Sequence, residues 1–417
     1  MSSKIIHKTK IAYNLLRSDG VLAVGIRSLE FIQKKVRSKN RNTHQGQIYT
    51  VARYEDVLNS NLTPKRNKWK GVLLPNAKFA WIMPPPGKGS GGHLNIFRFI
   101  EFLELAGYEC SIYLYVNGKH GDISSVRTIM GESYPKIKAA ESMCWLEPNE
   151  ELNDMDGIFA TSWETAYASY VLQSSAKRFY FVQDFEPYFY PVGGMSTLAE
   201  NTYRMEFYGI TAGGWLKKKL TSGYGMAADS YDFGSDEKIY KYTNSGKRNE
   251  IFYYARPYTE RRGFEVGVLA LDIFHRTHPE YTINIVGWDV SGYHIPFPYI
   301  NLKTLEINQL SDLYNRCVAG LVLSYTNMSL LPLELLGCGT IPVVNDGENN
   351  RLVSDNQYIA YSENSPIALA KQLFIVVSRK NIQAYSKKAS ESVKKSDWQA
   401  SGDKFVKIVE REMQNND

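Results

Sequence analysis

Short β-rich runs alternate with amphipathic segments of helical period, and this alternation constrains the fold of the chain more than any other feature. The first series predicts strands at 78–83, 110–116, 157–161, 178–183 and 209–212, with helices at 93–106, 163–173 and 215–220. Strands that alternate with helices are typical of parallel α/β sheets. The first series therefore predicts one α/β domain.

A second series of the same kind follows a polar stretch at 234–249 (GSDEKIYKYTNSGKRN), which has no apolar period and is predicted to be a linker. This series predicts strands at 250–255, 282–286, 320–324 and 340–344, with helices at 263–277, 309–317 and 330–336. A length of 417 residues also favours more than one domain. Two such domains would face each other across a cleft, with the functional site between them.

Composition excludes several classes of protein. A hydrophobic content of 43% with 13% aromatic residues is far from that of disordered chains. The absence of an apolar run of spanning length, and of a secretory signal, predicts a cytoplasmic protein. The four cysteines, Cys110, Cys144, Cys317 and Cys338, form no C-x-x-C pair, so we expect reduced, buried thiols and no structural metal.

Positive charge is concentrated at the start of the chain. Residues 1–41 carry a net charge of +8, whereas the whole chain carries +6. The rest of the chain, residues 42–417, is therefore nearly neutral, which disfavours a nucleic-acid-binding surface there. The basic segment also has apolar residues at helical spacing, so it could lie on an anionic membrane surface or pack on the body as an ordinary amphipathic helix.

A glycine-rich loop at 87–92 (GKGSGG) lies between a predicted strand and a predicted helix, and Gly87, Gly89 and Gly92 satisfy G-x-G-x-x-G. A dinucleotide site also needs an acidic residue after the second strand, where this chain has Val116-Asn117-Gly118. An NAD-dependent enzyme is therefore the weaker interpretation. The loop could still bring backbone N–H groups close to an anion or a sugar hydroxyl, or be a flexible turn after three prolines.

The triplet Asp154-Met155-Asp156 has the D-x-D form that holds a divalent metal in some sugar-transferring enzymes. The triplet is short and leads directly into a predicted strand. Polar residues at a strand entry are the simpler explanation, so no metal ligand is assigned.

Charged residues gather near predicted strand ends in the second domain. Arg256, Arg261 and Arg262 surround one strand-to-helix turn, and Lys303 stands alone among apolar residues near another strand. Guanidinium groups match phosphate oxygens in pairs. Glu334 lies in an otherwise apolar helix, for which Ser329 can be the N-cap. A carboxylate among leucines needs hydrogen-bond donors, such as ribose hydroxyls or an internal cation.

The order and spacing of these parts resemble the nucleotide-sugar site of GT-B glycosyltransferases of the retaining family-four type, over roughly residues 75–410. The resemblance is strongest to bacterial rhamnosyltransferases that build polyrhamnose glycans, such as surface-layer glycans. It rests on the basic N-terminal segment and on the runs FVQDFEPYFYP (181–191), GGWL (213–216) and SYTNMS (324–329).

The resemblance implies an α/β GT-B fold of two Rossmann-like domains. Its expected parts are a basic helical segment (1–70), an acceptor domain (71–240), a nucleotide-sugar domain (250–395) and a last helix returning to the first domain (396–417). The residues that it implies for the donor are Gly91, Gly92, Arg256, Arg262, Lys303, Ser329, Leu330 and Glu334, of which Arg256 and Lys303 would bind the diphosphate and Glu334 the ribose.

The sugar end of the site departs from the family. The earlier glutamate of the family's E-x7-E pair falls on Thr326, and Gln183-Asp184 stands where many members have a histidine. Asp184 and His93 are candidates to orient the acceptor hydroxyl, with polar structural residues as the alternative for each, and Gln183 is expected near the acceptor. Asp184 joins Arg256 and Lys303 as an expected catalytic residue.

The activity implied is metal-independent transfer of L-rhamnose from dTDP-β-L-rhamnose, with retention, onto a growing oligosaccharide or lipid-linked glycan, without a cofactor. The protein would be cytoplasmic, with peripheral attachment to the inner face of the membrane through residues 1–41 as one option. Two alternatives stay open: an NAD-dependent sugar-modifying enzyme that uses the loop at 87–92, and a non-catalytic sugar-binding subunit.

Overall fold

The computed structural model describes residues 51–62, 69, 71, 75–244, 246–394 and 396–415. The basic segment at 1–41 lies outside the described residues. In the described part of the chain, no helix is long and apolar enough to cross a membrane.

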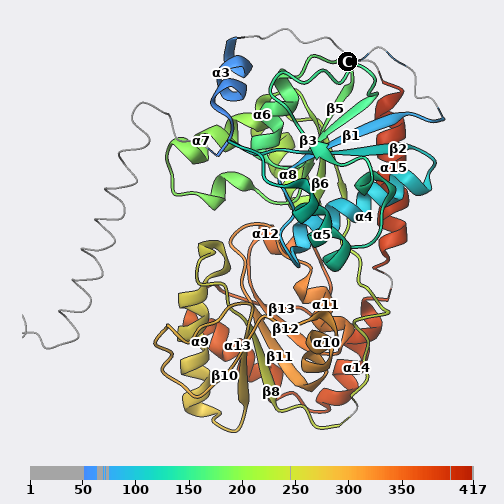
Figure 1. The fold of residues 1–417 in the computed structure, drawn as a ribbon. Coiled ribbons are helices and arrows are strands. Elements are labelled where there is room, and N and C mark those ends of the chain that lie inside the picture. Colours follow the sequence, from blue (N-terminus) through green and yellow to red (C-terminus); the bar gives the residue numbers. More distant parts are fainter. Residues whose placement is uncertain are drawn as a thin grey trace, which may run out of the picture. The chain divides into compact units, whose positions relative to one another are not determined.

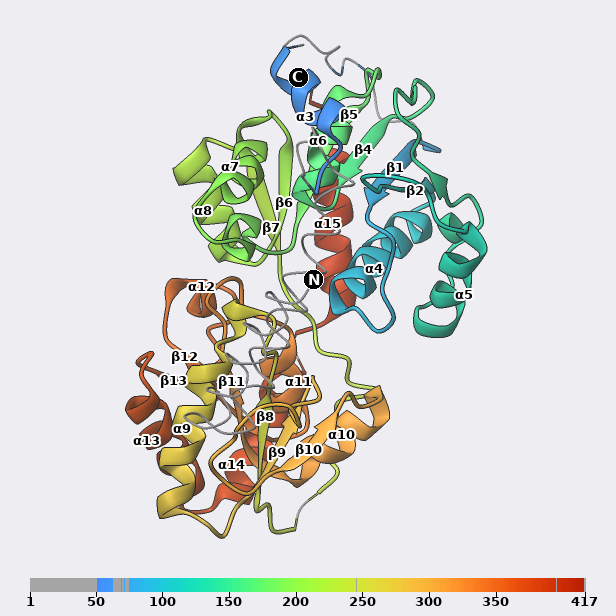
Figure 2. The same ribbon diagram turned by 60° about the vertical axis from the view of Figure 1, so that its left-hand side comes forward.

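The first sheet has seven parallel strands in the order β3-β2-β1-β4-β5-β6-β7 (Figures 1 and 2). The strands are β1 (Lys78–Met83), β2 (Glu109–Leu114), β3 (Cys144–Trp145), β4 (Gly157–Ala160), β5 (Lys177–Val182), β6 (Tyr208–Ala212) and β7 (Ala228–Tyr231). The accompanying helices are α3 (Tyr54–Leu62), α4 (Gly91–Leu105), α5 (Ile123–Ser133), α6 (Trp163–Val171), α7 (Gly194–Asn201) and α8 (Gly214–Tyr224), with 3-10 turns η1 (Lys138–Ala140), η2 (Glu186–Phe189) and η3 (Thr202–Arg204).

The second sheet has six parallel strands in the order β10-β9-β8-β11-β12-β13. The strands are β8 (Glu250–Tyr254), β9 (Thr282–Val286), β10 (Ile300–Lys303), β11 (Cys317–Val322), β12 (Ile341–Asn345) and β13 (Ala360–Ser362). The helices that follow them in the chain are α9 (Phe264–Thr277), α10 (Ile307–Arg316), α11 (Leu331–Gly337), α12 (Glu348–Arg351), α13 (Pro366–Val377), α14 (Ile382–Ser392) and α15 (Trp398–Met413), with the 3-10 turn η4 (Glu260–Arg262) before α9.

The central strands are buried on both faces, as parallel strands covered by helices must be. Every residue of β5 is buried, including Arg178. The Arg178 guanidinium donates to four backbone carbonyls at the end of α6 and in the turn after it, at 2.8–3.3 Å. A buried cation at the carbonyl end of a helix is thus fully hydrogen-bonded.

Helix α15 follows the second sheet in the chain but packs against α4 and β7 of the first part (Figure 1). Its Phe405 lies in the aromatic core of the first sheet, 4.9 Å from the Phe99 ring in an edge-on arrangement. Gly402 faces the Phe102 ring, where an added Cβ would come within 2.4 Å of ring carbon. Glycine therefore lets the helix approach α4 closely.

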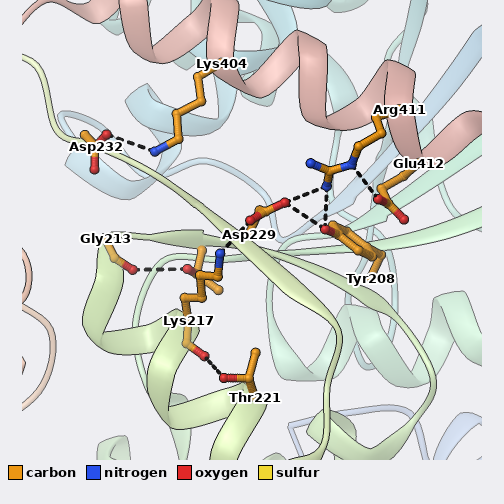
Figure 3. Close-up of polar contacts among 10 residues, drawn as sticks. Tyr208, Gly213, Lys217, Thr221, Asp229, Asp232, Lys404, Arg411 and Glu412 are labelled. Atoms are coloured by element: carbon orange, nitrogen blue, oxygen red, sulfur yellow. Dashed lines mark hydrogen bonds and ion pairs between the residues drawn. The ribbon is translucent and has the colours of Figure 1, made fainter.

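An ion-pair cluster fixes the outer face of α15 (Figure 3). The Asp229 carboxylate of β7 lies 2.5 Å from Arg411 Nη2 on α15 and 2.6 Å from Lys217 Nζ on α8. The Tyr208 hydroxyl also donates to it, at 2.9 Å. These donors outweigh the effect of burial and lower the pKa of Asp229 to about 2.

We predict that Asp229→Asn destabilises the protein at neutral pH by about 1 kcal/mol. This is less than the full pKa shift of Asp229 would give, because solvent screens the partly exposed side chains that pair with it. The carboxyl pKa is lower in the folded chain than in the unfolded one, so this contribution is present above about pH 4 and is lost as the pH falls towards about 2. Thermal unfolding of wild type and Asp229→Asn, at neutral pH and near pH 2, measures this contribution to stability. Asp232→Asn, which removes an exposed pair with Lys404, should have a smaller effect.

The predicted strands and helices are all present, with ends shifted by up to four residues. The short strands β3, β7, β10 and β13, and helices α3, α5, α7, α12, α13 and α14, were not among the predicted elements. Cys110, Cys317 and Cys338 are free and buried, as predicted. Cys144 is exposed because it lies in the two-residue edge strand β3, so the prediction of a buried thiol was wrong there.

Candidate functional site

Strand order reverses between β1 and β4 in the first sheet and between β8 and β11 in the second. In open parallel sheets, ligands bind outside the carboxyl ends of the strands at such points. The segments that follow these four strands are 84–92, 161–164, 255–263 and 323–330. Most of the candidate site residues lie on them or directly after them.

The carboxyl edges of the two sheets meet through the residues after β5 and β11. Asp184 Oδ2 accepts a hydrogen bond from Thr326 Oγ1 at 3.0 Å, and its Oδ1 accepts one from Asn327 N at 2.8 Å. The Asn327 side-chain amide donates to the carbonyls of Gln183 (3.1 Å) and Ala212 (2.8 Å), which lie just after β5 and at the end of β6. The carboxylate of Asp184 thus lies beside Thr326, the position at which the resemblance described above leads one to expect a glutamate.

Arg261 extends from the second domain towards the first. Its Nε lies 3.6 Å from Asp184 Oδ2, and its guanidinium carbon lies 3.9 Å from the centre of the Phe189 ring. Burial lowers the pKa of Arg261, and the Asp184 carboxylate opposes this effect. Arg261 therefore contributes to the junction between the domains, away from the hydrogen bonds of Arg256 and Arg262.

Arg256 and Arg262 lie on the segment after β8. Arg256 Nε donates to the Tyr254 hydroxyl at 2.9 Å, and Arg262 Nη1 donates to Ser324 Oγ at 2.8 Å. Since β8 and β11 are neighbours, Arg262 reaches the segment after β11. The structure thus brings Arg262 to Ser324 at the carboxyl edge of the sheet, and Arg256 lies on the same segment as Arg262.

Lys303 lies apart from that group. It ends the edge strand β10, two strands from β8, so roughly 10 Å separates the two strand ends. Its side chain is 62% exposed and pairs with Asp289 Oδ2 at 3.0 Å. Its φ of 55° is also uncommon for a residue with a side chain. Lys303 would have to leave Asp289 to reach a ligand beside Arg256.

Glu334 lies half-buried on α11, and burial raises the pKa of its carboxyl to about 7. Arg98 on α4 and the Tyr240 hydroxyl favour the charged form, whereas Asp236 opposes it. Glu334 thus ionises close to neutral pH, where a bound ligand can favour either the protonated or the ionised form of the carboxyl.

The prediction that Ser329 caps α11 is wrong. The helix begins at Leu331, and Leu330 is the N-cap residue without a side-chain hydrogen bond. Ser329 Oγ is buried and has no hydrogen-bond partner in the described part of the chain. The helix begins one residue later than the sequence suggested, at Leu331 and not at Leu330, so Leu330 takes the cap position that was expected for Ser329.

The candidates from the first domain lie at the start of α4. Gly91 and Gly92 are exposed in its first turn, and Gln183 Nε2 donates to the Gly92 carbonyl at 3.1 Å. His93 Nδ1 lies 2.8 Å from Ser90 Oγ, and burial lowers the pKa of His93. These residues share the carboxyl edge with Asp184.

Asp154 and Asp156 lie at the opposite, amino end of β1 and β4. Asp156 Oδ2 accepts a hydrogen bond from Lys78 N at 2.8 Å, and Asp154 Oδ2 lies 3.9 Å from Lys78 Nζ. No group of histidine, cysteine or carboxylate side chains suited to a metal ion occurs among the described residues.

Sequence reasoning missed Glu186 and Arg98 at these edges. Each is a charged residue in a run rich in apolar or aromatic residues: FVQDFEPYFY for Glu186, which also holds Asp184, and NIFRFI for Arg98. The same signal had singled out Glu334 among leucines. Applied evenly, it would have selected all three.

Parts of the chain match known proteins. Residues 249–374 match the model of the WsaF C-terminal domain, a segment that includes Arg256, Arg262, Lys303 and Glu334. The O-antigen biosynthesis protein RfbC of Myxococcus xanthus is 30% identical over 339 residues, which are 78% of this chain and 26% of that protein. The chain thus spans about a quarter of the length of this curated relative.

Solved structures share the architecture. Anabaena Alr3699/HepE in complex with UDP and glucose aligns with a TM-score of 0.59 at 13% identity, over 79% of this chain and 99% of that one. An alpha-glucosyltransferase in complex with UDP and a 13-mer DNA aligns with a TM-score of 0.53 at 13% identity, over 81% of this chain and 100% of that one. The fold is GT-B. The predicted fold class is therefore confirmed.

Proposed function

We propose that this chain is a glycosyltransferase that binds a nucleotide-sugar donor at the carboxyl edge of the six-stranded sheet. One observation carries the proposal. The segment that matches the WsaF C-terminal domain contains the turn after β8, which carries Arg256 and Arg262, and helix α11 after β11, which carries Glu334. Two arginines and a carboxylate at a point where strand order reverses suit a diphosphate and a ribose.

The chemistry of sugar transfer suits these residue types. When the bond between the anomeric carbon and the β-phosphate oxygen breaks, negative charge develops on that oxygen. Fixed cations stabilise the charge without reorganising during the reaction. Arg256 is the donor-site cation that would act there, joined by Lys303 once it leaves Asp289. Glu334 would accept hydrogen bonds from the ribose hydroxyls.

We further propose L-rhamnose from dTDP-β-L-rhamnose as the donor sugar and a bacterial surface glycan as the acceptor. The resemblance of 181–191 and 324–329 to rhamnosyltransferases supports the sugar, and the name of the Myxococcus relative supports a role in surface glycan synthesis. The reaction would retain the anomeric configuration. The acceptor oxygen bonds to the anomeric carbon on the face that the phosphate leaves, and the acceptor proton passes to the departing phosphate oxygen.

A thermal-shift series with dTDP-, UDP-, GDP- and ADP-sugars, followed by an assay of released nucleoside diphosphate, tests this function. A ligand at 100 times its dissociation constant adds about 2.7 kcal/mol to stability, a readily measured shift. We expect dTDP-β-L-rhamnose to give the largest shift and to turn over with an oligosaccharide acceptor. Stabilisation without release of nucleoside diphosphate would instead identify a sugar-binding subunit.

Transfer should survive chelation. The cations available to the diphosphate are Arg256, Arg262 and Lys303, so the rate in EDTA should equal the rate with added Mg²⁺. Release of nucleoside diphosphate measures it. Loss of activity in EDTA that Mg²⁺ or Mn²⁺ restores would contradict this and turn attention to Asp154 and Asp156.

Residues 1–41 should attach the protein reversibly to anionic membranes. Their net charge of +8 motivates the proposal, since each basic residue near an anionic surface contributes about 1 kcal/mol, decreasing with salt. Co-sedimentation with anionic liposomes should fall sharply when residues 1–41 are removed. Equal binding of the full and truncated chains would refute the attachment.

A further inference from the structure

The turns η2 and η4 bring a set of unusual side chains together where the two domains meet. Residues of η2 contact residues of η4 directly. Turn η2 exposes two aromatic rings, Tyr188 at 53% and Phe189 at 36%. Exposed aromatic rings beside a candidate site offer flat apolar faces to a ligand.

Glu186, the first residue of η2, is held through one oxygen. Its Oε2 accepts hydrogen bonds from Trp163 N at 2.6 Å and from the Tyr180 hydroxyl at 2.8 Å. Its Oε1 has no hydrogen-bond partner among the described residues. Burial and the nearby Glu164 carboxylate raise the pKa of Glu186 well above its usual range. A neutral carboxyl group can both donate and accept a hydrogen bond, as a sugar hydroxyl requires.

Arg261 faces the same place from η4. Stacking on Phe189 and the nearby Asp184 carboxylate fix the plane of its guanidinium. Its Nε is buried and has no hydrogen-bond acceptor within the described chain. The Glu186 carboxyl acts electrostatically on Arg261, yet no ion pair joins the two in the described part of the chain. Two polar groups that act on each other without an ion pair are ones that a hydroxyl or a water can bridge.

We propose that Glu186, Arg261 and Tyr188 form a subsite for one sugar ring of the acceptor saccharide. The proposal rests on the proposed function and extends it to the acceptor. Arg261 and Glu186 bind neighbouring hydroxyls, while Tyr188 covers the apolar face of the ring. Because Arg261 belongs to the donor domain and Glu186 to the other, the subsite is complete only while the domains are in contact.

Arg261→Gln and Tyr188→Ala test the subsite. Each should raise the KM for an oligosaccharide acceptor at least tenfold, because each removes a direct contact with the sugar. Donor hydrolysis without acceptor and the affinity for the nucleoside diphosphate should stay within twofold of wild type. Matched controls are Arg276→Gln, an exposed arginine on α9, and Phe374→Ala, an exposed aromatic on α13, which should change none of these quantities.

Saturation-transfer NMR with methyl α-L-rhamnopyranoside gives a readout independent of turnover. We expect a signal with wild type that Tyr188→Ala and Arg261→Gln each reduce and the controls leave unchanged. An unchanged acceptor KM, an equal loss of donor binding, or an NMR signal insensitive to both variants would overturn the subsite. Wild type that releases no nucleoside diphosphate would refute the transferase, and the NMR result would still decide whether the subsite binds a sugar.

Discussion

Replacing Arg256 with alanine should lower kcat/KM by about 10²-fold or more, the scale expected when one fixed charge-stabilising group is lost. The Tyr254 hydroxyl holds the Arg256 guanidinium at 2.9 Å at the carboxyl end of β8, so the cation is positioned before substrate binds. Steady-state kinetics with donor in excess measures kcat, and donor titration measures KM. Because Arg256 would stabilise charge that develops only in the transition state, its removal should lower mainly kcat.

Arg276→Ala is the matched control, since Arg276 is an exposed arginine that pairs with Asp272 on α9 and should tolerate the change. Lys303→Ala should resemble Arg256→Ala if Lys303 exchanges Asp289 for the diphosphate. Asp289→Asn, which frees Lys303, should then leave kcat/KM unchanged or higher. Full activity of the Arg256→Ala protein would show that Arg256 does not act in catalysis.

The fold could be predicted because local signals and tertiary structure agree. Strand β1 has the predicted bounds, since a buried run, KFAWIM, ends at three prolines. Strand β3 has two residues and no pattern of its own, so it forms only because Leu114 and Tyr113 offer a partner edge. Such an element depends on contacts remote in sequence.

The candidate site was predictable in its position along the chain and less so in its contacts. The strand end before Arg256 and the helix that carries Glu334 follow from periodicity alone. The direction of each side chain does not. Asp184, expected to orient an acceptor, has both oxygens bonded to Thr326 and Asn327, residues about 140 positions away. Arg261 and Arg262 are adjacent, yet one faces Asp184 and the other Ser324.

Glu334→Gln should act mainly on donor affinity, raising KM with a smaller change in kcat. Ribose hydroxyls change little between the ground state and the transition state, so a group that binds them contributes equally to both. Gln keeps the size of the side chain but offers one acceptor oxygen in place of two. Calorimetry with the nucleoside diphosphate measures the loss of affinity without turnover.

The pH dependence separates this role from a merely structural one. With a pKa of about 7, Glu334 is increasingly protonated as the pH falls below 7, so wild-type donor KM should rise by up to tenfold per pH unit there. The Glu334→Gln protein should lack this dependence. Since the pKa is higher in the folded chain than in the unfolded one, wild-type stability falls as the pH rises from about 4.5 through about 7. Glu334→Gln should remove that loss and be no less stable than wild type at pH 8.

The same variant decides between ribose binding and covalent catalysis. If Glu334 were the nucleophile of a double displacement, its carboxylate would attack the anomeric carbon, and its loss would abolish kcat while donor binding persisted. A raised pKa weakens that alternative at neutral pH, because part of the carboxyl is protonated and cannot attack. Glu334→Gln protein that binds donor with unchanged affinity by calorimetry, yet shows no turnover, would make Glu334 the nucleophile. Weakened binding with turnover retained at saturating donor supports the ribose contact.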